Sequence, residues 1–376
     1  MRFEEAYGGW RGKRLSQEEA AQLLGVCERT FRRYIDRFEE AGLDGLIDKR
    51  LDQVSHLCAP VDEVLGLEML YRQRYDGWTV QHFFERYQSE HQGERGYTWV
   101  KQRLQTAGLV QKGKRKGAHR RRRERAALEG MMIHQDGSSH CWVPELEWDL
   151  IVTMDDATST VYSAFFVEEE GTWSSFGGVR EVLQKHGLFS SFYTDRGSHY
   201  WHTPQAGGKV DRTNLTQFGR AMDQLGITMI AAYSPQARGR SERMFRTLQD
   251  RLPKELALHG ITDKAAANRF LLERFLPAFN RQFAVTAAAE GKAFVPLLGV
   301  NLDEILCLKA ERTVGHDNCV SYQSKVLQLP KMAGRCHYVK AKVMVHEYAD
   351  GRVAVFHGPR KLAHYEASGA LCAQAA

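Results

Sequence analysis

The sequence has no long hydrophobic run: no eighteen consecutive apolar residues occur anywhere in its 376 residues. A membrane-spanning helix needs about twenty such residues, so we expect no membrane span. The first ten residues, MRFEEAYGGW, carry early acidic residues and no continuous apolar segment, so we expect no secretory signal peptide. These absences predict a protein with no membrane partner.

Cysteine is scarce and unpaired in the sequence. The seven cysteines are odd in number and scattered, and no Cys-x-x-Cys motif occurs. This pattern argues against both a disulfide framework and a zinc site, and it is typical of reduced thiols in the cytoplasm.

The overall composition is that of a globular protein, with 43% hydrophobic and 26% charged residues. The length predicts two to four domains. The net charge of +6 is modest, and the positions of the basic residues are more informative than their number.

The N-terminal region has the pattern of a helix-turn-helix. Ser16 and Glu19 form a capping-box motif, and Gly25 ends the first helix. A second helix is expected over residues 28–40, with an apolar face that includes Phe31 and Ile35 and arginines away from that face. The alternative is a solvated helical pair in an unrelated bundle. We favour DNA binding, because both the turn and the basic face fit it.

A second helical region is expected over residues 61–109. Its last part, YTWVKQRLQTAGLV, has an apolar stripe with Lys101 and Arg103 outside it. Thr79 and Thr98 would begin two helices, so this region is a weaker candidate for another helix-turn-helix.

Residues 112–125, KGKRKGAHRRRRER, hold nine lysines or arginines. Such a run cannot pack into a core, because its charges repel one another unless an anion neutralises them. A solvated linker or a surface helix would have the same composition. Between two candidate DNA-binding regions, a linker that follows DNA phosphates is the better interpretation.

The central region changes to an alternation of strands and helices. Strands are expected over 131–142, 148–154 and 160–167, followed by a helix over 172–186 and a strand over 189–194. A helix over 215–225 and a strand over 227–232 come next. This order predicts a mixed five-stranded sheet with helices on its faces.

The C-terminal region is rich in short strands and predicts a small β-barrel with basic loops. Strands are expected over 318–322, 325–329, 338–347 and 352–356, with an Asp-Gly hairpin turn at 350–351. The last residues, which are rich in alanine, are expected to form a tail.

Three acidic residues stand at special points of the central region. Asp136 lies in the first strand, Asp195 follows the fourth strand, and Glu242 lies early on the helix after the fifth strand. Carboxylates at such positions of an open sheet can converge at one edge. Neighbouring carboxylates repel unless a cation compensates them, and Mg²⁺ prefers oxygen ligands. The three residues are therefore candidate metal ligands.

Other polar residues near these acids admit more than one interpretation. Asp155 and Asp156 could compete for the role of the first carboxylate, but their place between two strands is more typical of a turn. The run Glu168–Glu170 is expected to be a solvated loop. His134 and His140 share a strand face with Asp136, so they are either helpers in substrate or metal binding or ordinary histidines. Arg196 would contact either DNA or a nearby acid.

The motif Pro-Gln-x-x-Gly-x-x-Glu, formed by Pro235, Gln236, Gly239 and Glu242, resembles the region around the last acid of DDE transposases of the retroviral-integrase-like superfamily. The Thr-Asp-x-Gly turn at Asp195 is similar to the region of their second acid. The layout from about residue 10 to 360 resembles bacterial insertion-sequence transposases, in particular the ISNCY type.

This resemblance implies a multidomain transposase with a ribonuclease-H-like catalytic core. Its implied catalytic and metal-binding triad is Asp136, Asp195 and Glu242, with two Mg²⁺ or Mn²⁺ ions. The implied partners are double-stranded DNA, as terminal inverted repeats and as target, and further copies of the chain, as a dimer or a larger multimer. Residues 200–214, YWHTPQAGGKVDRTN, depart from the family pattern as an insertion between the last two acids. The zinc module of retroviral integrases is also missing.

The predicted domains are 1–55 (helix-turn-helix), 56–110 (second helical region), 111–127 (basic linker), 128–300 (catalytic core), 301–365 (barrel) and 366–376 (tail). A non-catalytic repressor derived from a transposase and a structure-specific nuclease of the same fold remain alternatives. The predicted DNA-contact residues are Arg29, Arg32, Arg33, Arg37, Lys101, Arg103, Lys112, Lys114, Arg115, Lys116, Arg120, Arg121, Arg122, Arg123, Arg238, Arg240, Arg243 and Arg246.

Overall fold

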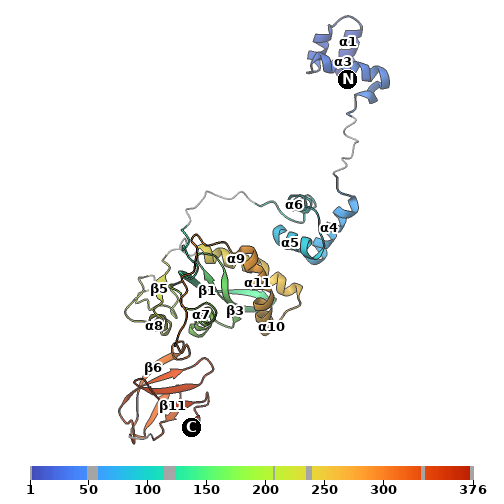
Figure 1. The fold of residues 1–376 in the computed structure, drawn as a ribbon. Helices are drawn as coiled ribbons and strands as arrows, with labels where there is room; N and C mark the ends of the chain where they lie inside the picture. Colours follow the sequence, from blue (N-terminus) through green and yellow to red (C-terminus); the bar gives the residue numbers. More distant parts are fainter. Residues whose placement is uncertain are drawn as a thin grey trace. The chain divides into compact units, whose positions relative to one another are not determined.

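The computed structural model describes residues 2–48, 58–113, 123–205, 208–233, 239–331 and 335–372 (Figure 1). The chain divides into two compact units. The first comprises Met1–Arg74 and Gln102–Leu109, and the second comprises Tyr75–Lys101 and Val110–Ala376. Within the described ranges, no helix is both long enough and apolar enough to cross a membrane.

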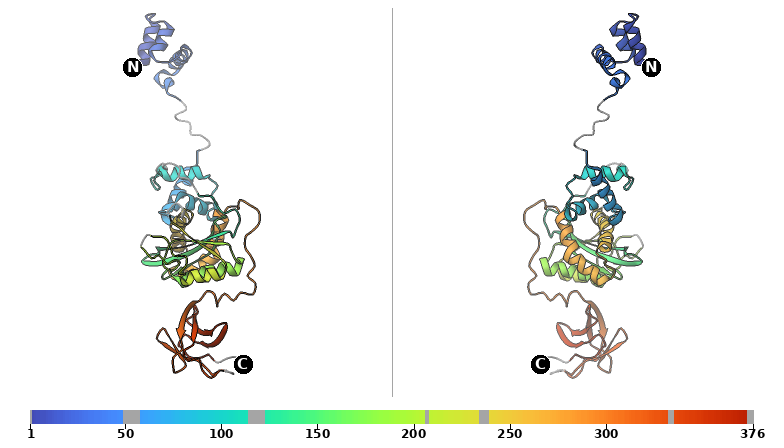
Figure 2. Two further views of the ribbon diagram at one scale, coloured as in Figure 1. Left: turned by 90° about the vertical axis from the view of Figure 1, so that its left-hand side faces the viewer. Right: turned by 90° about the vertical axis from the view of Figure 1, so that its right-hand side faces the viewer.

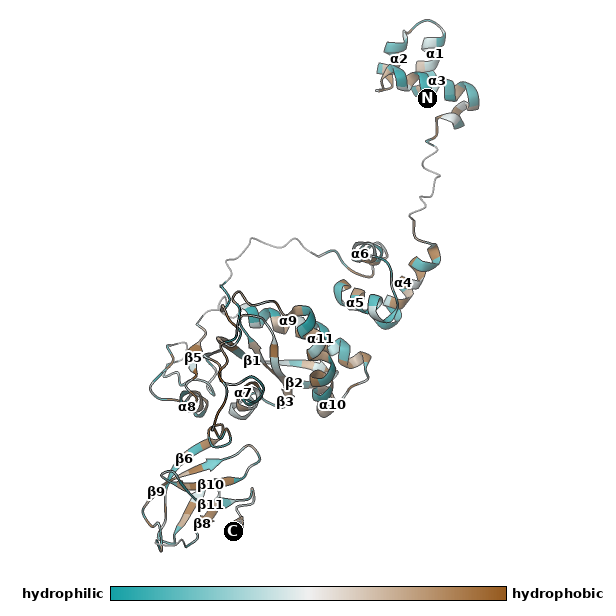
Figure 3. Cartoon of the chain, in the orientation of Figure 1, coloured by the Kyte–Doolittle hydropathy of each residue, from teal (hydrophilic) through white to brown (hydrophobic). Residues whose placement is uncertain are grey.

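The N-terminal helices form the expected helix-turn-helix around a small aromatic core. They are α1 (Arg2–Arg11), α2 (Gln17–Leu23), α3 (Glu28–Ala41) and the short 3₁₀ helix η1 (Gly42–Leu46). Ser16 and Glu19 form the predicted capping box at the start of α2. Phe31 and Ile35 of α3 are buried. Teal predominates along α2 and α3 in Figure 3, in keeping with their many charged residues.

Helix α1 was not among the predicted elements, because its sequence contains the helix-weakening pair Gly8–Gly9. The structure explains the presence of glycine at position 9 by close packing. A Cβ atom at this position would lie 2.6 Å from Leu15 Cδ1, so glycine allows the chain after α1 to pack closely against the helix.

The second helical region has three helices, α4 (Val61–Arg74), α5 (Val80–Glu90) and α6 (Tyr97–Thr106). As predicted, Thr79 is the N-cap of α5, and α6 begins beside Thr98. Val100 and Leu104 of α6 are fully buried, which confirms the predicted apolar stripe. Helix α5 belongs to the second compact unit, together with the sheet that follows.

The central sheet has the mixed, five-stranded form that was predicted. Its strands are β1 (Met132–Val143), β2 (Leu146–Asp155), β3 (Val161–Val167), β4 (Ser191–Thr194) and β5 (Thr228–Ala231), in the order β3-β2-β1-β4-β5. Strands β1, β2 and β3 pair in antiparallel fashion, whereas β1–β4 and β4–β5 are parallel pairs.

Helices cover both faces of this sheet (Figures 1 and 2). One face packs against α7 (Thr172–His186) and α8 (Gln217–Gln224) in a core that includes Ile133 and Phe192. The other face packs against α9 (Gly239–Leu258), α10 (Lys264–Phe270), η3 (Leu271–Phe275) and α11 (Leu276–Phe283) in a core that includes Trp142 and Leu248. No prediction was made for the helices after α9.

Two asparagines cover the outer edge of β3. The side-chain amide of Asn268 in α10 accepts from Phe166 N at 2.7 Å and donates to Phe166 O at 3.1 Å. Asn280 in α11 pairs with the N–H and C=O of Val161 in the same way. Each amide satisfies backbone groups that an edge strand otherwise leaves open, so α10 and α11 close one side of the sheet.

The C-terminal domain consists of two antiparallel sheets over one apolar core. The first has the order β11-β10-β9-β6, formed by β6 (Leu308–Thr313), β9 (Lys342–Glu347), β10 (Val353–His357) and β11 (Arg360–Tyr365). The second pairs β7 (Cys319–Tyr322) with β8 (Lys325–Gln328). In the described residues the two sheets remain separate, so the predicted closed barrel is not observed.

Candidate active site

The first two acids of the predicted triad lie at the same level of neighbouring strands. In the parallel pair of β1 and β4, the last paired residues are His134 and Tyr193. Asp136 and Asp195 each follow two residues later. Strand β4 ends at Thr194, whereas β1 continues to Val143. Asp195 therefore lies just beyond the end of β4, and Asp136 lies in the stretch of β1 that has no β4 residue paired to it.

Asp136 lies on the face of β1 that helix α9 covers. Ser138, two residues further along β1, accepts a hydrogen bond from Gln249 of α9 at 2.9 Å. His134, two residues earlier, bonds to Asp156, which also binds Arg240 of α9. Residues i and i+2 of a strand share a face, so Asp136 lies between two points where α9 is joined to β1.

Glu242 lies in the first turn of α9, and its side chain is exposed. In the described residues, no group of three or more His, Cys, Asp and Glu side chains is arranged to hold a metal ion. The structure therefore brings the strands of Asp136 and Asp195 together but does not gather Glu242 with them. The motif residues Pro235 and Gln236, which precede it, lie outside the described residues.

The start of α9 is fixed by a buried carboxylate. Asp156 is fully buried and forms ion pairs with the guanidinium groups of Arg123 and Arg240. It also accepts from Ala126 N at 2.7 Å and bonds to His134 Nε2 at 2.6 Å. Burial would raise the pKa of Asp156, but these partners, His134 first, outweigh it and lower the pKa below its usual range.

Asp155 joins the turn after β2 to the backbone at Gly130. It is fully buried and accepts hydrogen bonds from Gly130 N, Thr158 N and the Thr158 hydroxyl. Burial raises the pKa of its carboxyl group. The interpretation of Asp155 and Asp156 as structural turn residues is confirmed. His134, as a partner of Asp156, is a packed histidine.

One acid of the run Glu168–Glu170 differs from the expected solvated loop. Glu168 pairs with Lys264, and Glu169 is exposed. Glu170 is only partly exposed, lies against Gly137 of β1, and pairs with His199. The sequence contained one usable signal, because Glu170 lies two residues before the start of α7, between the end of β3 and that helix.

The predicted DNA-contact residues divide into three groups. Those on exposed surface are Arg29, Arg32, Arg33, Arg37, Lys101, Lys112, Arg243 and Arg246, while Arg103 is partly exposed. Arg123 and Arg240 form ion pairs with the buried Asp156. Those outside the described residues are Lys114, Arg115, Lys116, Arg120, Arg121, Arg122 and Arg238.

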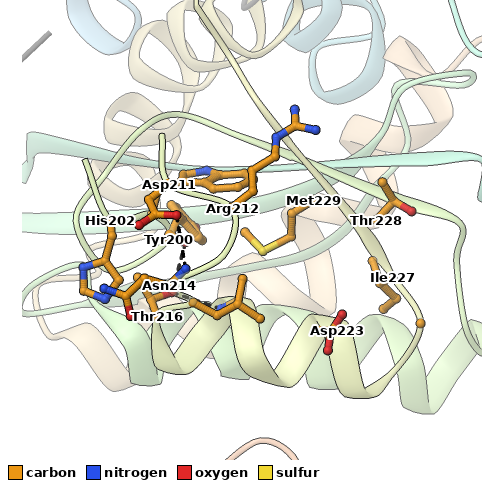
Figure 4. Close-up of a pocket in the computed structure, with 14 residues that line it drawn as sticks. Tyr200, His202, Asp211, Arg212, Asn214, Thr216, Asp223, Ile227, Thr228 and Met229 are labelled. Carbon is orange, nitrogen blue, oxygen red and sulfur yellow. Dashed lines mark hydrogen bonds between the residues drawn. The ribbon is translucent and has the colours of Figure 1, made fainter. Parts of the chain in front are cut away.

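The inserted segment after Asp195 packs beside β5 and α8. Trp201 Nε1 donates to Thr194 Oγ1 at 2.9 Å, and Asp211 N donates to His202 O at 2.7 Å. Together with β5 and α8, the segment lines a cavity of about 330 Å³ (Figure 4). Arg196 donates to Gly208 O in the same segment. The insertion thus leaves the pairing of β1 with β4 intact.

The far half of α9 is joined to α5 by a buried charge network. Glu255 bonds to His82 Nε2 at 2.6 Å and forms an ion pair with Arg86. Arg251 forms an ion pair with Glu85 at 2.6 Å. Burial would raise the pKa of Glu255, but the hydrogen bonds from His82 and Arg86 lower it to about 2. Helix α9 is therefore fixed to α5 as well as to the sheet.

The donor set fits a hard divalent cation. Mg²⁺ binds through one or two carboxylates and keeps several of its waters, and Asp136 and Asp195 lie at the same level of adjacent strands. Glu242 lies in the first turn of the helix that covers Asp136, but in the described residues it is not gathered with the two aspartates.

The chain is similar to transposases along most of its length. The winged helix-turn helix family model matches residues 8–53. A Sinorhizobium fredii (strain NBRC 101917 / NGR234) protein, provisionally named transposase y4bF, is 32% identical over 351 residues, which cover 91% of this chain and 75% of that protein. The transposase for insertion sequence IS1202 of Streptococcus pneumoniae is 30% identical over 235 residues, which cover 61% of this chain and 50% of that relative.

Two viral proteins are similar solved structures. One is the simian T-cell lymphotropic virus intasome in complex with PP2A regulatory subunit B56 gamma, with 13% identity, coverage of 73% of this chain and 90% of that chain, and a TM-score of 0.35. The other is the HTLV-2 integrase catalytic core domain with magnesium in its dimeric form, with 15% identity, coverage of 39% and 88%, and a TM-score of 0.30. The identity to y4bF over three quarters of that relative is sufficient to assign the family, and this chain belongs to the transposases.

Proposed function

We propose that this transposase cleaves DNA at the ends of an insertion sequence and joins the freed 3′-hydroxyls to target DNA. The common level of Asp136 and Asp195 at the end of β4 carries this proposal. Two carboxylates placed together repel each other, so the arrangement is favourable when a divalent cation compensates their charge.

We assign Asp136, Asp195 and Glu242 as the residues that hold Mg²⁺ or Mn²⁺. Two such ions, when bound, would activate a water or a 3′-hydroxyl and neutralise the charge of the phosphodiester. Asp136 and Asp195 are presented by neighbouring strands, and Glu242 by the first turn of α9. Cleavage and joining are both in-line phosphoryl transfers, so one set of carboxylates can serve both.

The binding of element ends is assigned to the helix-turn-helix and to the basic segments. The arginines of α3 are exposed on the side away from Phe31 and Ile35, as a helix that enters the major groove requires. Arg243 and Arg246 are exposed on α9 within one turn of Glu242, where they would contact phosphates near the scissile bond. Two ends must be held together for joining, so we propose a multimer on DNA, acting at the bacterial nucleoid.

The test uses DNA fragments from the sequences that flank the gene, incubated with the full chain and Mg²⁺ or Mn²⁺. The proposal predicts nicks that release 3′-hydroxyl ends, followed by branched products joined to a second labelled duplex. Binding without nicking would instead support the repressor, and nicking without any joined product would support the nuclease.

A further inference from the structure

The loop before α7 is fixed to the sheet beside Ser139, three residues after Asp136 on β1. Glu170 N donates to Asp149 Oδ2 of β2 at 2.7 Å, and the other oxygen of Asp149 accepts from Ser139 of β1. Glu170, the last of the three consecutive acids, is therefore held against β1 from the face that α7 covers.

The carboxylate of Glu170 occupies the space that a side chain at position 137 would need. A Cβ atom built on Gly137 would lie 2.2 Å from Glu170 Oε2 and 2.5 Å from its Cδ. The absence of a side chain thus lets the carboxylate rest directly on the strand. Gly137 is the residue next to Asp136, so Glu170 is brought to β1 one residue away from the first acid of the triad.

His199 connects the same carboxylate to the loop of Asp195. The position of a Cβ on Gly197 is 3.0 Å from Asp195 Oδ1 and 3.0 Å from His199 Cε1, so the ring and the Asp195 carboxylate are neighbours. The Nε2 atom of the same ring lies 3.5 Å from Glu170 Oε1. The ring of His199 therefore lies between Asp195 and Glu170.

The buried side chain of Tyr200 lies close enough to these carboxylates for their charges to affect its pKa. Burial raises its pKa most, and the charges of Glu170, Asp136 and Asp195 raise it further. The charges of all three carboxylates therefore act on the same phenol group. Its hydroxyl donates to Gln135 Oε1 at 2.9 Å and accepts from Ser175 at 3.1 Å, which fixes it at the level of β1 before Asp136.

We infer that Glu170 is a further carboxylate of the divalent-metal site and approaches β1 from the α7 face, whereas Glu242 approaches from the α9 face. This inference rests on the proposed function, because it adds a residue to the same site. A divalent cation held by Asp136 and Asp195 would take a further oxygen ligand from Glu170. A flexible glutamate on the second face can supply one more oxygen ligand without moving the strands.

The test measures Mn²⁺ binding by the full chain without DNA, by electron paramagnetic resonance of the free ion. Glu170→Gln removes the charge and keeps the shape, and the matched control is Glu169→Gln, an exposed neighbour in the same run. Gly137→Ala is a second variant that keeps every charge but displaces the Glu170 carboxylate. Circular dichroism shows whether each variant is folded.

We expect Glu170→Gln and Gly137→Ala to raise the Kd for Mn²⁺ at least about tenfold, while Glu169→Gln leaves it unchanged. Wild-type affinity in Glu170→Gln would overturn the inference. The variant Asp136→Asn distinguishes a failure of this inference from a failure of the proposed metal site. If it weakens binding and Glu170→Gln does not, only this inference fails. If neither variant changes Mn²⁺ binding, the proposed metal site itself fails.

Discussion

Removing the charge of Glu255 should destabilise the second unit markedly. Its carboxylate is 3% exposed, and it holds His82 and Arg86 of α5 against α9. Its pKa is lowered from 4.5 to about 2. A depressed carboxyl pKa stabilises the fold above pH 4.5, and this contribution is lost as the pH falls toward 2. The shift corresponds to about 3 kcal/mol at neutral pH.

Removing one member of a buried ion pair costs about 3–5 kcal/mol, because the remaining charge has no partner. Arg86 is partly exposed and keeps its ion pair with Glu90, so the lower end of this range applies to Glu255→Gln. At about 2 °C per kcal/mol for a large domain, the midpoint of thermal unfolding should fall by roughly 6 °C.

Thermal and urea unfolding of the full chain between pH 2.5 and pH 7 tests this reasoning. Wild type should lose stability below pH 4.5, whereas Glu255→Gln should be less stable at neutral pH and lose less on acidification. Glu273→Gln is the matched control, because Glu273 is exposed on the neighbouring η3. Equal unfolding midpoints and equal acid sensitivity for wild type and Glu255→Gln would refute the role given to this network.

Three further variants test other parts of the structure. Asp156→Asn should lower the free energy of unfolding by about 3 kcal/mol and slow DNA cleavage, because it releases Arg240 at the start of α9; a wild-type melting midpoint contradicts this. Asn268→Ala should cost about 1–3 kcal/mol in urea unfolding, because two backbone groups of β3 lose their partners, and an unchanged urea midpoint would count against this. Arg33→Ala should weaken DNA binding and reduce the salt dependence by about one phosphate contact, as measured by fluorescence anisotropy at several salt concentrations, and an unchanged slope excludes the contact.

The fold was largely predictable wherever local signals agreed with one another. The capping box at Ser16 and the apolar face of α3 belong to single elements, and the alternation of strands and helices belongs to a short stretch of chain. Helix α1 was not predicted, because a glycine such as Gly9 weakens a helix locally. The close packing of Leu15 against Gly9, which requires glycine at this position, is formed only in the folded chain.

The candidate site was harder to predict, because it depends on which strands pair. Asp136 and Asp195 could be singled out from motifs, but their common level follows from the register of β1 with β4. The ion pair of Arg240 with Asp156 could not be predicted, because nothing in the local sequence links residues 84 positions apart. Glu170 appeared to be solvent-exposed, because its contact with Gly137 is formed only when the loop before α7 folds back onto β1.

The most direct test of the central claim is single-turnover cleavage of a labelled DNA end by Asp136→Asn, Asp195→Asn and Glu242→Gln. Each variant should stay folded, bind DNA as wild type does, and cleave at least about a hundredfold more slowly, as expected for loss of a group that stabilises the charge of the transition state. Glu169→Gln, which changes an exposed acid of the same domain, should cleave normally. Cleavage at the wild-type rate by Glu242→Gln or by either aspartate variant would contradict the assignment of these acids.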